Sequence, residues 1–230
     1  MKVLVVIPAY NEEESIEGVV DNLIENFPQY NYVIINDGSK DGTLQLCHNK
    51  NYNIIDLPVN LGLAGAFQTG LKYAYQKDYD YAIQFDADGQ HLPEYIEPMI
   101  KKMNEGYDMV IGSRFVDKVK PKTLRMLGSR VISTAIKLTT GRYIADPTSG
   151  MRMFNKMLIK EFSENINYEP EPDTVSFLIK QGVKVAEVPA EMKERVAGES
   201  YLNISRSISY MAKMFISIVL VQNFRNRRKK

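Results

Sequence analysis

Two aspartates separated by a single residue, Asp86 and Asp88, are the side chains of this sequence best suited to bind a divalent cation. Carboxylates this close repel each other unless a cation or hydrogen-bond donors lie between them. Magnesium and manganese prefer oxygen ligands, and phosphate groups of a bound substrate often supply some of these oxygens. Gln90 adds a neutral oxygen two residues later. The pattern predicts a Mg²⁺ or Mn²⁺ site at Asp86, Asp88 and Gln90, and a solvated acidic turn is the simpler alternative.

Three further polar segments also follow short apolar runs directly: Pro8–Glu12, Asn36–Ser39 and Gly112–Arg114. Each one alone is explained as a turn or a helix cap, and Asn11 followed by Glu14 fits a capping box. In an open parallel sheet, however, such segments lie at one edge, where ligands bind. We therefore expect them to form one site together with Asp86 and Asp88.

Two familiar nucleotide-binding motifs are absent. The segment after the first apolar run has no glycine, so the dinucleotide-binding fingerprint is missing. The segment Gly65–Gly70 resembles a phosphate-binding loop, but Leu71 stands where that loop requires lysine. We interpret Gly65–Gly70 as part of a helix whose small residues allow close packing.

The charge is nearly balanced, with 29 basic against 28 acidic residues, but it is unevenly distributed. Lys118–Arg142 contains seven basic and no acidic residues, and five of the last six residues are basic. Such zones indicate an anionic ligand or surface: nucleic acid, phosphate or an anionic membrane. The basic tail lacks interleaved aromatic residues and no groove-reading motif is present, which disfavours nucleic acid.

The elements that must position these residues alternate between two periodicities. The apolar runs predict strands, and the segments between them have helical spacing, which indicates a mainly parallel sheet covered by helices on both faces. The expected strands are Val3–Pro8, Tyr32–Asn36, Asn53–Leu57, Tyr81–Phe85, Met109–Gly112 and Val183–Val188. The expected helices are Glu12–Asn26, Asp41–Asn49, Leu61–Gln76, Pro93–Asn104, Thr123–Thr140 and a long C-terminal helix.

The C-terminal helix is expected to lie on a membrane surface. Ile204, Ile208, Met211, Phe215 and Ile218 recur at helical spacing, and the basic tail follows at once. A helix that packs on the sheet or on another subunit is the alternative. We recognise no signal peptide or membrane-spanning segment in the sequence. The single cysteine, Cys47, is expected to be a buried residue in a reducing compartment.

Taken in order, the motifs resemble those of the family 2 glycosyltransferases, in particular the polyprenyl-phosphate sugar synthases. The resemblance implies a GT-A, Rossmann-like α/β fold and metal-dependent, inverting transfer from a nucleotide-diphosphate sugar to a polyprenyl phosphate. Asn36 departs from it, because the family often has an aspartate there, and Glu169–Asp173 matches no standard motif. The residues that carry it are Pro8–Glu12, Asn36–Ser39, Asp86–His91, Gly112–Arg114, Asp146–Arg152 and Arg195–Ser200.

The resemblance also implies roles for individual residues. Asp88, Arg114 and Arg195 are expected to be catalytic, with Arg195 closing on the diphosphate. Arg114, Arg125, Ser129 and Arg130 are expected to hold the acceptor phosphate, because guanidinium groups match phosphate oxygens, and a solvated helix face is the alternative for Arg125 and Arg130. Outside the resemblance, Glu171 and Asp173 are candidate contacts to sugar hydroxyls, and a Pro-rich surface loop is the favoured alternative for them. The expected nucleotide-sugar residues are Pro8, Ala9, Tyr10, Glu12, Asp37, Asp86, Ala87, Asp88 and Arg195.

We expect residues 1–202 to form the catalytic domain, with a nucleotide-sugar half (1–115) and an acceptor half (116–202), and residues 203–230 to form the membrane-surface segment. The expected donor is UDP-glucose or UDP-N-acetylglucosamine, with GDP-mannose as the alternative. The expected location is the cytoplasmic face of a membrane, where a small transmembrane partner or a homo-oligomer could cover the same surface. The alternatives are transfer to a saccharide hydroxyl, a sugar nucleotidyltransferase and a nucleic-acid-binding module.

Overall fold

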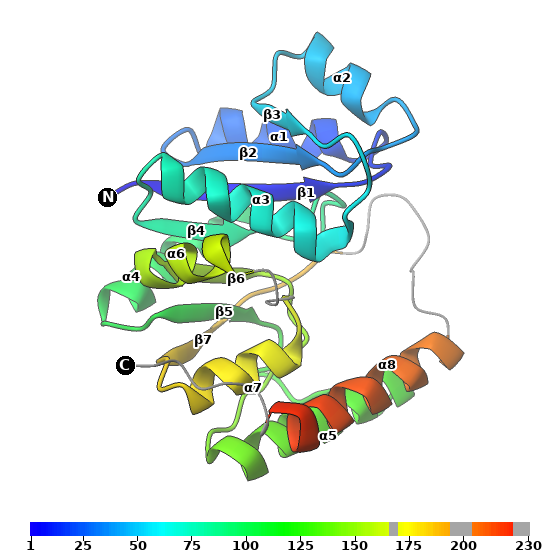
Figure 1. Cartoon of the computed structure of the whole chain (residues 1–230), viewed down its shortest axis with the longest axis vertical. Coiled ribbons are helices and arrows are strands. Elements are labelled where there is room, and N and C mark those ends of the chain that lie inside the picture. The colour runs from blue at the N-terminus through cyan, green and yellow to red at the C-terminus, as the bar shows by residue number, and fades with distance from the viewer. Residues whose placement is uncertain (166–169, 194–203, 223–230) are drawn as a thin grey trace.

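The computed structural model of this chain describes residues 1–165, 170–193 and 204–222, without the side chains of residues 124, 125 and 204–208. Its centre is a seven-stranded sheet with the strand order β3-β2-β1-β4-β6-β5-β7 (Figure 1). All neighbouring strands run parallel except at β6, which is antiparallel to both β4 and β5. The strands are β1 (Val3–Ala9), β2 (Asn31–Asn36), β3 (Ile54–Asp56), β4 (Tyr81–Gln84), β5 (Met109–Ser113), β6 (Arg152–Asn155) and β7 (Val185–Pro189).

Helices cover both faces of the sheet, as the alternating pattern predicts. Strand β1 shows why, because Leu4 and Val6 enter the core of one face while Val5 and Ile7 enter the core of the other. The first face packs against α3 (Gly62–Gln76), α6 (Lys156–Glu164) and α7 (Pro172–Lys180). The second face packs against α1 (Ile16–Asn26), α2 (Thr43–Asn49), η1 (Pro93–Tyr95) and α4 (Ile96–Asn104).

Helix α3 confirms the interpretation of the glycine-containing segment. A Cβ atom on Gly70 would lie 2.1 Å from Val6 Cγ1 of β1, so only glycine allows this approach of helix to strand. The glycines therefore serve packing, and the segment is the helix expected from its small residues.

Two long helices lie side by side beyond β7, α5 (Leu124–Thr140) and α8 (Ile204–Ile216), and α8 continues into η2 (Ser217–Val221) (Figure 1). Helix α5 begins at the N-cap Thr123, whose hydroxyl accepts a hydrogen bond from Met126 N, and it ends at Gly141 with φ 76°. No helix in the described ranges is long and apolar enough to cross a membrane.

The C-terminal helix does not present the expected residues as one exposed stripe. Ile218 is fully buried, as is Met214 at 3% exposure, whereas Phe215 is 42% exposed. One face of α8 and η2 therefore packs into the core, and a different apolar face is open to solvent. The side chains of Ile204 and Ile208 and the basic tail lie outside the described residues.

Candidate active site

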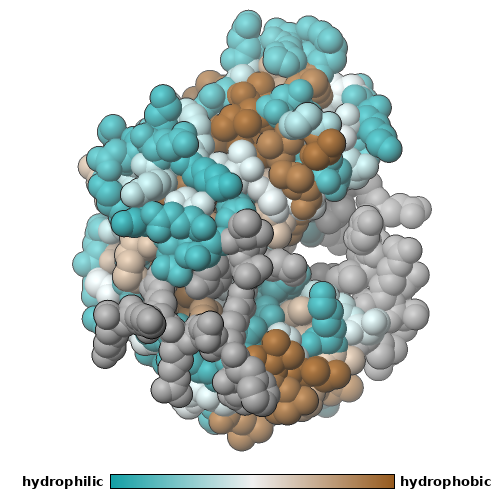
Figure 2. Space-filling model, in the orientation of Figure 1, coloured by the Kyte–Doolittle hydropathy of each residue, from teal (hydrophilic) through white to brown (hydrophobic). Residues whose placement is uncertain are grey.

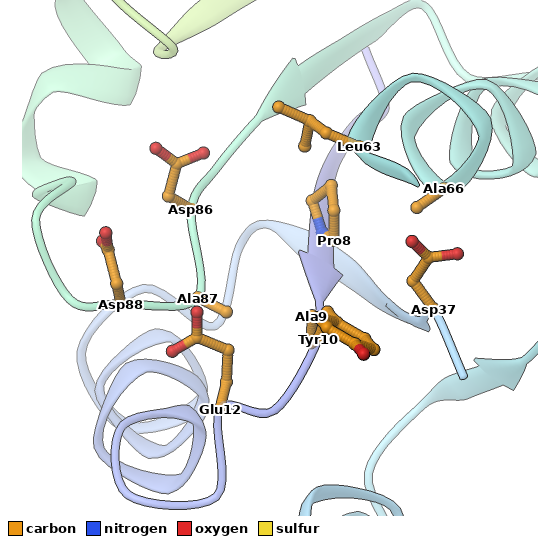
Figure 3. Close-up of a pocket in the computed structure, with 10 residues that line it drawn as sticks. All are labelled: Pro8, Ala9, Tyr10, Glu12, Asp37, Leu63, Ala66, Asp86, Ala87 and Asp88. Carbon is orange, nitrogen blue, oxygen red and sulfur yellow. The ribbon is translucent and has the colours of Figure 1, made fainter. Parts of the chain in front are cut away.

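The carboxyl ends of β1, β2 and β4 lie together and form a cavity of about 250 Å³ (Figure 3). It brings together the residues expected to bind the nucleotide sugar, apart from Arg195, which lies outside the described residues. Leu63 and Ala66 of α3 complete the wall. The lining residues are Pro8, Ala9, Tyr10, Glu12, Asp37, Leu63, Ala66, Asp86, Ala87 and Asp88.

The segments after β1 and β2 are fastened to each other by side-chain hydrogen bonds. Asn11 N donates to Ser39 Oγ (3.0 Å), and Asn11 Oδ1 accepts from Lys40 N (2.8 Å). Asn11 has φ 57°, a left-handed conformation that asparagine tolerates, and α1 begins only at Ile16. The expected helix start at Glu12 is therefore wrong, and the alternative of Asn11 as a helix cap is excluded as well, because Asn11 ties two loops of the site together.

Asp86 and Asp88 follow β4 and point to the same side of the chain, with the Glu12 carboxylate below them (Figure 3). Asp88 is 4% exposed, and its Oδ1 accepts a hydrogen bond from Gln90 N (3.0 Å). The side-chain nitrogen of Gln90, Nε2, donates to Lys193 O (3.3 Å). The described residues contain no cluster of three or more His, Cys, Asp or Glu suited to a metal ion. Two aspartates lining one open cavity fit a cation that takes its other ligands from a bound molecule.

His91 positions Asp86, a role that the sequence analysis did not assign. Its ring is buried and lies edge-on to Phe85, with the ring centres 5.4 Å apart. Nδ1 accepts a hydrogen bond from Asp86 N (2.9 Å), and Nε2 lies 3.4 Å from Asp86 Oδ2. Because Nδ1 is the acceptor, the ring hydrogen of the neutral histidine is on Nε2, the atom that faces the carboxylate.

The loop before β6 also packs closely against the Asp86 side chain. A Cβ atom on Gly150 would lie 3.1 Å from Asp86 Oδ2 and 3.4 Å from His91 Cε1. The fully buried Arg152 holds this loop in place by donating to Ser149 O and Pro147 O, both at 2.8 Å. The segment Asp146–Arg152 therefore contributes backbone shape around Asp86.

The cavity adjoins a larger one of about 700 Å³, with which it shares Tyr10, Asp37, Leu63 and Asp86. Helices α5 and α8 provide part of its wall through Ser129 and Tyr210. Gln84 lines it as well, and its side-chain oxygen is buried without a hydrogen-bond partner in the described part of the chain. The remaining lining residues are Asn60, Gly62, Met126, Thr148, Ser149, Gly150, Arg152, Pro170, Glu171, Pro172 and Met211.

The residues expected at the acceptor phosphate are only partly brought together. Arg114 donates to Asp146 through Nε (2.7 Å) and Nη2 (2.8 Å), and Nη2 also reaches Thr148 Oγ1 (3.2 Å). Ser129 lines the larger cavity, whereas Arg130 lines a separate cavity and donates to the carbonyl of Lys120. The Arg125 side chain lies outside the described residues.

The Arg114–Asp146 pair is strongly held. Asp146 is fully buried, which by itself opposes ionisation, but the hydrogen bonds and charge of Arg114 outweigh burial and lower the pKa of Asp146 below its usual value. The guanidinium is therefore fixed behind Thr148, a residue of the larger cavity's wall.

The two carboxylates expected to contact sugar hydroxyls have different positions. Glu171 lines the larger cavity and accepts a hydrogen bond from Tyr210 of α8. Asp173 lines neither of these two cavities, because its Oδ2 accepts from Ser217 Oγ (2.6 Å) and Gln222 Nε2 (3.1 Å). Asp173 thus attaches the C-terminal helix to the start of α7, and its contact with a sugar hydroxyl stays a prediction.

The sequence matches the family described as Glycosyl transferase family 2 over residues 4–163. It is 34% identical over 211 residues to the UDP-N-acetylglucosamine–dolichyl-phosphate N-acetylglucosaminyltransferase of Methanococcus voltae, covering 81% of this chain and 84% of that protein. It is 27% identical over 226 residues to the polyprenol monophosphomannose synthase of Mycolicibacterium smegmatis, covering 93% and 85%.

The fold is similar to that of glucosyl-3-phosphoglycerate synthase from Mycobacterium tuberculosis, solved with Mn²⁺, UDP-glucose and phosphoglyceric acid. The TM-score is 0.68 at 16% identity, and the match covers 96% of this chain and 79% of that one. This likeness confirms the expected GT-A fold. On the sequence match, the chain belongs to glycosyl transferase family 2.

Proposed function

We propose that this glycosyltransferase moves a sugar from a nucleotide-diphosphate sugar to a polyprenyl phosphate, with inversion at the sugar. The observation that carries the proposal is the joined pair of cavities. The smaller one gathers the predicted nucleotide-sugar residues around Asp86 and Asp88, and it shares its wall with a larger one that reaches α5. Two relatives whose names specify a dolichyl-phosphate acceptor and a polyprenol monophosphomannose product support it.

A phosphate acceptor suits the chemistry of the described residues. A phosphate monoester has its second pKa near ~6, so its oxygen is already ionised at neutral pH and requires no general base. His91, the buried histidine of the site, is held by Asp86 and is not placed to act as one. The larger cavity offers Ser129 as a donor to the acceptor phosphate, and Arg114 stands behind Thr148. Arg125, Arg130 and Arg195 remain proposed phosphate ligands.

The proposed cofactor is a divalent cation, Mg²⁺ or Mn²⁺, held by Asp86 and Asp88 with Gln90 as a further oxygen ligand. When bound, it neutralises the negative charge that develops on the departing diphosphate. The chain's own residues fit this role because both aspartates line the cavity and His91 fixes the first of them. The Mn²⁺ and UDP-glucose bound to the structural neighbour agree with it.

We propose a UDP-sugar donor, UDP-glucose or UDP-N-acetylglucosamine, ahead of GDP-mannose. Asp37 and the Pro8–Glu12 segment are the proposed base and ribose contacts, since they lie at the ends of β2 and β1 beside the cavity. Asp37 is fixed in that place because its Oδ1 accepts from Leu61 N (2.7 Å). The UDP-N-acetylglucosamine named for one relative supports a UDP-sugar, and the monophosphomannose product named for the other supports mannose as the transferred sugar.

We propose that the protein works at the cytoplasmic face of a membrane without crossing it, with residues 203–230 as the attached segment of a catalytic domain formed by 1–202. An exposed apolar patch covers α5, α8 and η2, and Figure 2 shows part of it at the lower edge of the molecule. Three candidates could cover this patch: an anionic membrane surface, a transmembrane partner protein and a second copy of this chain. The exposed residues are Leu127, Val131, Leu138, Phe215, Ile216, Leu220 and Val221.

The test is a transfer assay with purified protein and three labelled donors, UDP-glucose, UDP-N-acetylglucosamine and GDP-mannose. Each is offered with farnesyl phosphate, farnesol or a free monosaccharide, in Mn²⁺, Mg²⁺ or EDTA. We expect label in the farnesyl phosphate product alone, and only with a divalent cation. Transfer to the monosaccharide with none to farnesyl phosphate would instead establish the saccharide hydroxyl as the acceptor.

A further inference from the structure

Gln84, the last residue of β4, places a polar side chain on a face of the sheet that is otherwise apolar along this strand. Ala82 lies in the core of the face covered by α3, and side chains two residues apart on a strand point to the same side. Gln84 is 1% exposed, and Val6, its partner on β1, belongs to the same core. A glutamine in such a place is costly unless hydrogen bonds satisfy its amide.

The residues around Gln84 leave its acceptor unsatisfied. Its Oε1 is buried and accepts no hydrogen bond in the part of the chain that the structure describes. Arg152 stands directly opposite on β6, but its Nε, Nη1 and Nη2 all donate to main-chain carbonyls. Those carbonyls belong to Ser149, Glu171 and Pro147. The donor that faces Gln84 across the two strands is therefore turned to other acceptors.

The position of Gln84 distinguishes it from the other buried acceptors. Ser176 Oγ and Gln222 Oε1 are also buried without a partner among the described residues, but neither residue lines the smaller or the larger cavity. Gln84 lines the larger cavity together with Asp86, which follows it by two residues. The last torsion of a glutamine side chain has a broad minimum, so a small rotation presents Oε1 to a ligand in that cavity.

The chemistry of an amide oxygen restricts which part of a substrate it binds. The oxygen requires a hydrogen-bond donor. The ionised oxygens of a diphosphate or of an acceptor phosphate are themselves acceptors, and a prenyl chain has no polar hydrogen. The donors that remain in the proposed substrates are the N–H groups of the base, the ribose hydroxyls, and the hydroxyl or acetamido N–H groups of the transferred sugar.

The strand order separates the sugar from the base and the ribose. The proposed base and ribose contacts follow β1 and β2, whereas Gln84 lies on β4, which has β1 on one side and β6 on the other. Those contacts line the smaller cavity, and Gln84 does not. Asp86, a proposed ligand of the cation on the diphosphate, comes directly after β4. A nucleotide sugar that extends from β2 across β1 to β4 therefore brings its sugar to Gln84.

We propose that the Gln84 amide binds the transferred sugar of the donor, accepting a hydrogen bond from a hydroxyl or acetamido N–H group. The inference rests on the proposed nucleotide-sugar donor and adds a residue that selects the sugar. A buried acceptor that the correct sugar satisfies is left unpaired by an analogue without that group, which is why such contacts discriminate strongly between substrates. Gln84 is thus a specificity-determining residue and has no part in the chemical step.

The experiment compares wild type with Gln84→Met, which keeps the length of the side chain and removes its hydrogen-bonding groups. The donor that wild type uses best is offered beside analogues that each lack one hydroxyl or the acetamido group, with Mn²⁺ and farnesyl phosphate. We expect kcat/KM of wild type to fall at least about tenfold for one analogue. Gln84→Met should use that analogue and the full donor alike. Its affinity for the nucleoside diphosphate, measured by calorimetry, should equal that of wild type.

The matched control is Gln222→Met, because Gln222 is a buried glutamine whose Oε1 also lacks a partner in the described chain, but it lines neither cavity. It should discriminate between donor and analogue as wild type does. Thermal unfolding without donor gives a second readout. Because Gln84→Met removes a buried acceptor without a partner, its Tm should not fall below that of wild type. A lower Tm, or failure to fold, would show that the amide serves the fold and would overturn the proposal.

The outcomes separate this inference from the proposed function. If wild type transfers no sugar from any nucleotide sugar to farnesyl phosphate, the proposed function fails. If wild type transfers sugar and Gln84→Met keeps the same preference among the analogues, the role of Gln84 alone is overturned. Weaker binding of the nucleoside diphosphate by Gln84→Met would assign the contact to the base or ribose instead. Wild type that uses every analogue as well as the full donor would overturn the inference without any variant.

Discussion

Replacing Asp146 by asparagine tests how Arg114 is held next to the cavity. The substitution keeps the side chain's shape but leaves Arg114, whose side chain is 24% exposed, without its counter-charge. Removing one partner of a buried ion pair costs about 3–5 kcal/mol, and the partial exposure of Arg114 places this case near ~3 kcal/mol. For a chain of this size, that loss corresponds to a fall in Tm of about 6–12 °C.

The assay is chemical and thermal unfolding followed by circular dichroism, with Lys118→Gln as the matched control. Lys118 pairs with Glu191, but the two side chains are 66% and 65% exposed, so its loss should cost less than about 1 kcal/mol. A second variant, Arg114→Gln with Asp146→Asn, removes both partners and should recover part of the lost stability. If Asp146→Asn lowers the free energy of unfolding no more than Lys118→Gln does, the Arg114–Asp146 ion pair does not stabilise this part of the structure.

The same pair has a defined pH dependence. The pKa of Asp146 in the folded protein lies below its usual 3.8, because the contacts with Arg114 outweigh burial. A carboxyl group whose pKa is lower in the folded protein stabilises that protein at pH values above the pKa it has in the unfolded chain. This contribution is lost as the pH falls through the pKa of the folded protein. The stability difference between wild type and Asp146→Asn should therefore be constant at neutral pH and shrink below about pH 4. A difference that grows with acidification would contradict the assignment.

Three further substitutions test the site around Asp86. Asp88→Asn should reduce transfer to background without unfolding the chain, and activity within a few-fold of wild type that still requires metal would contradict the metal site. His91→Phe should weaken Mn²⁺ affinity by about 10–100-fold, the usual effect of losing a group that orients a metal ligand, while nucleotide binding measured without metal stays unchanged. Gly150→Ala places a methyl group against Asp86 Oδ2, so Mn²⁺ affinity should fall while Tm changes little; an unchanged affinity would show that the loop yields freely.

Much of the fold could be predicted because the information is local. Apolar runs such as Val3–Pro8 predict strands directly, and parallel strands place their carboxyl ends at one edge. The sequence alone therefore groups Tyr10, Asp37 and Asp86. The helix containing Gly70 could be distinguished from a phosphate loop because a single required lysine was missing.

The rest depends on contacts between segments far apart in the sequence. Nothing in the spacing of Arg152 shows that β6 enters the sheet antiparallel between β4 and β5, or that Gly150 then lies against Asp86. Asp173 has the same local pattern whether it meets a sugar or Ser217 of the C-terminal helix. His91 could have been suspected, since its distance along the chain lets it fold back onto Asp86.

The central claim is that a phosphate oxygen attacks the sugar, and the structure of the product tests it most directly. Wild-type protein is incubated with UDP-glucose or UDP-N-acetylglucosamine, Mn²⁺ and farnesyl phosphate, and the product is examined by mass spectrometry and by ¹H and ³¹P NMR. We predict a phosphodiester that joins the sugar's anomeric carbon to the farnesyl phosphate, with the anomeric configuration inverted relative to the donor. A product with retained configuration, or a sugar attached through any hydroxyl, would contradict the account.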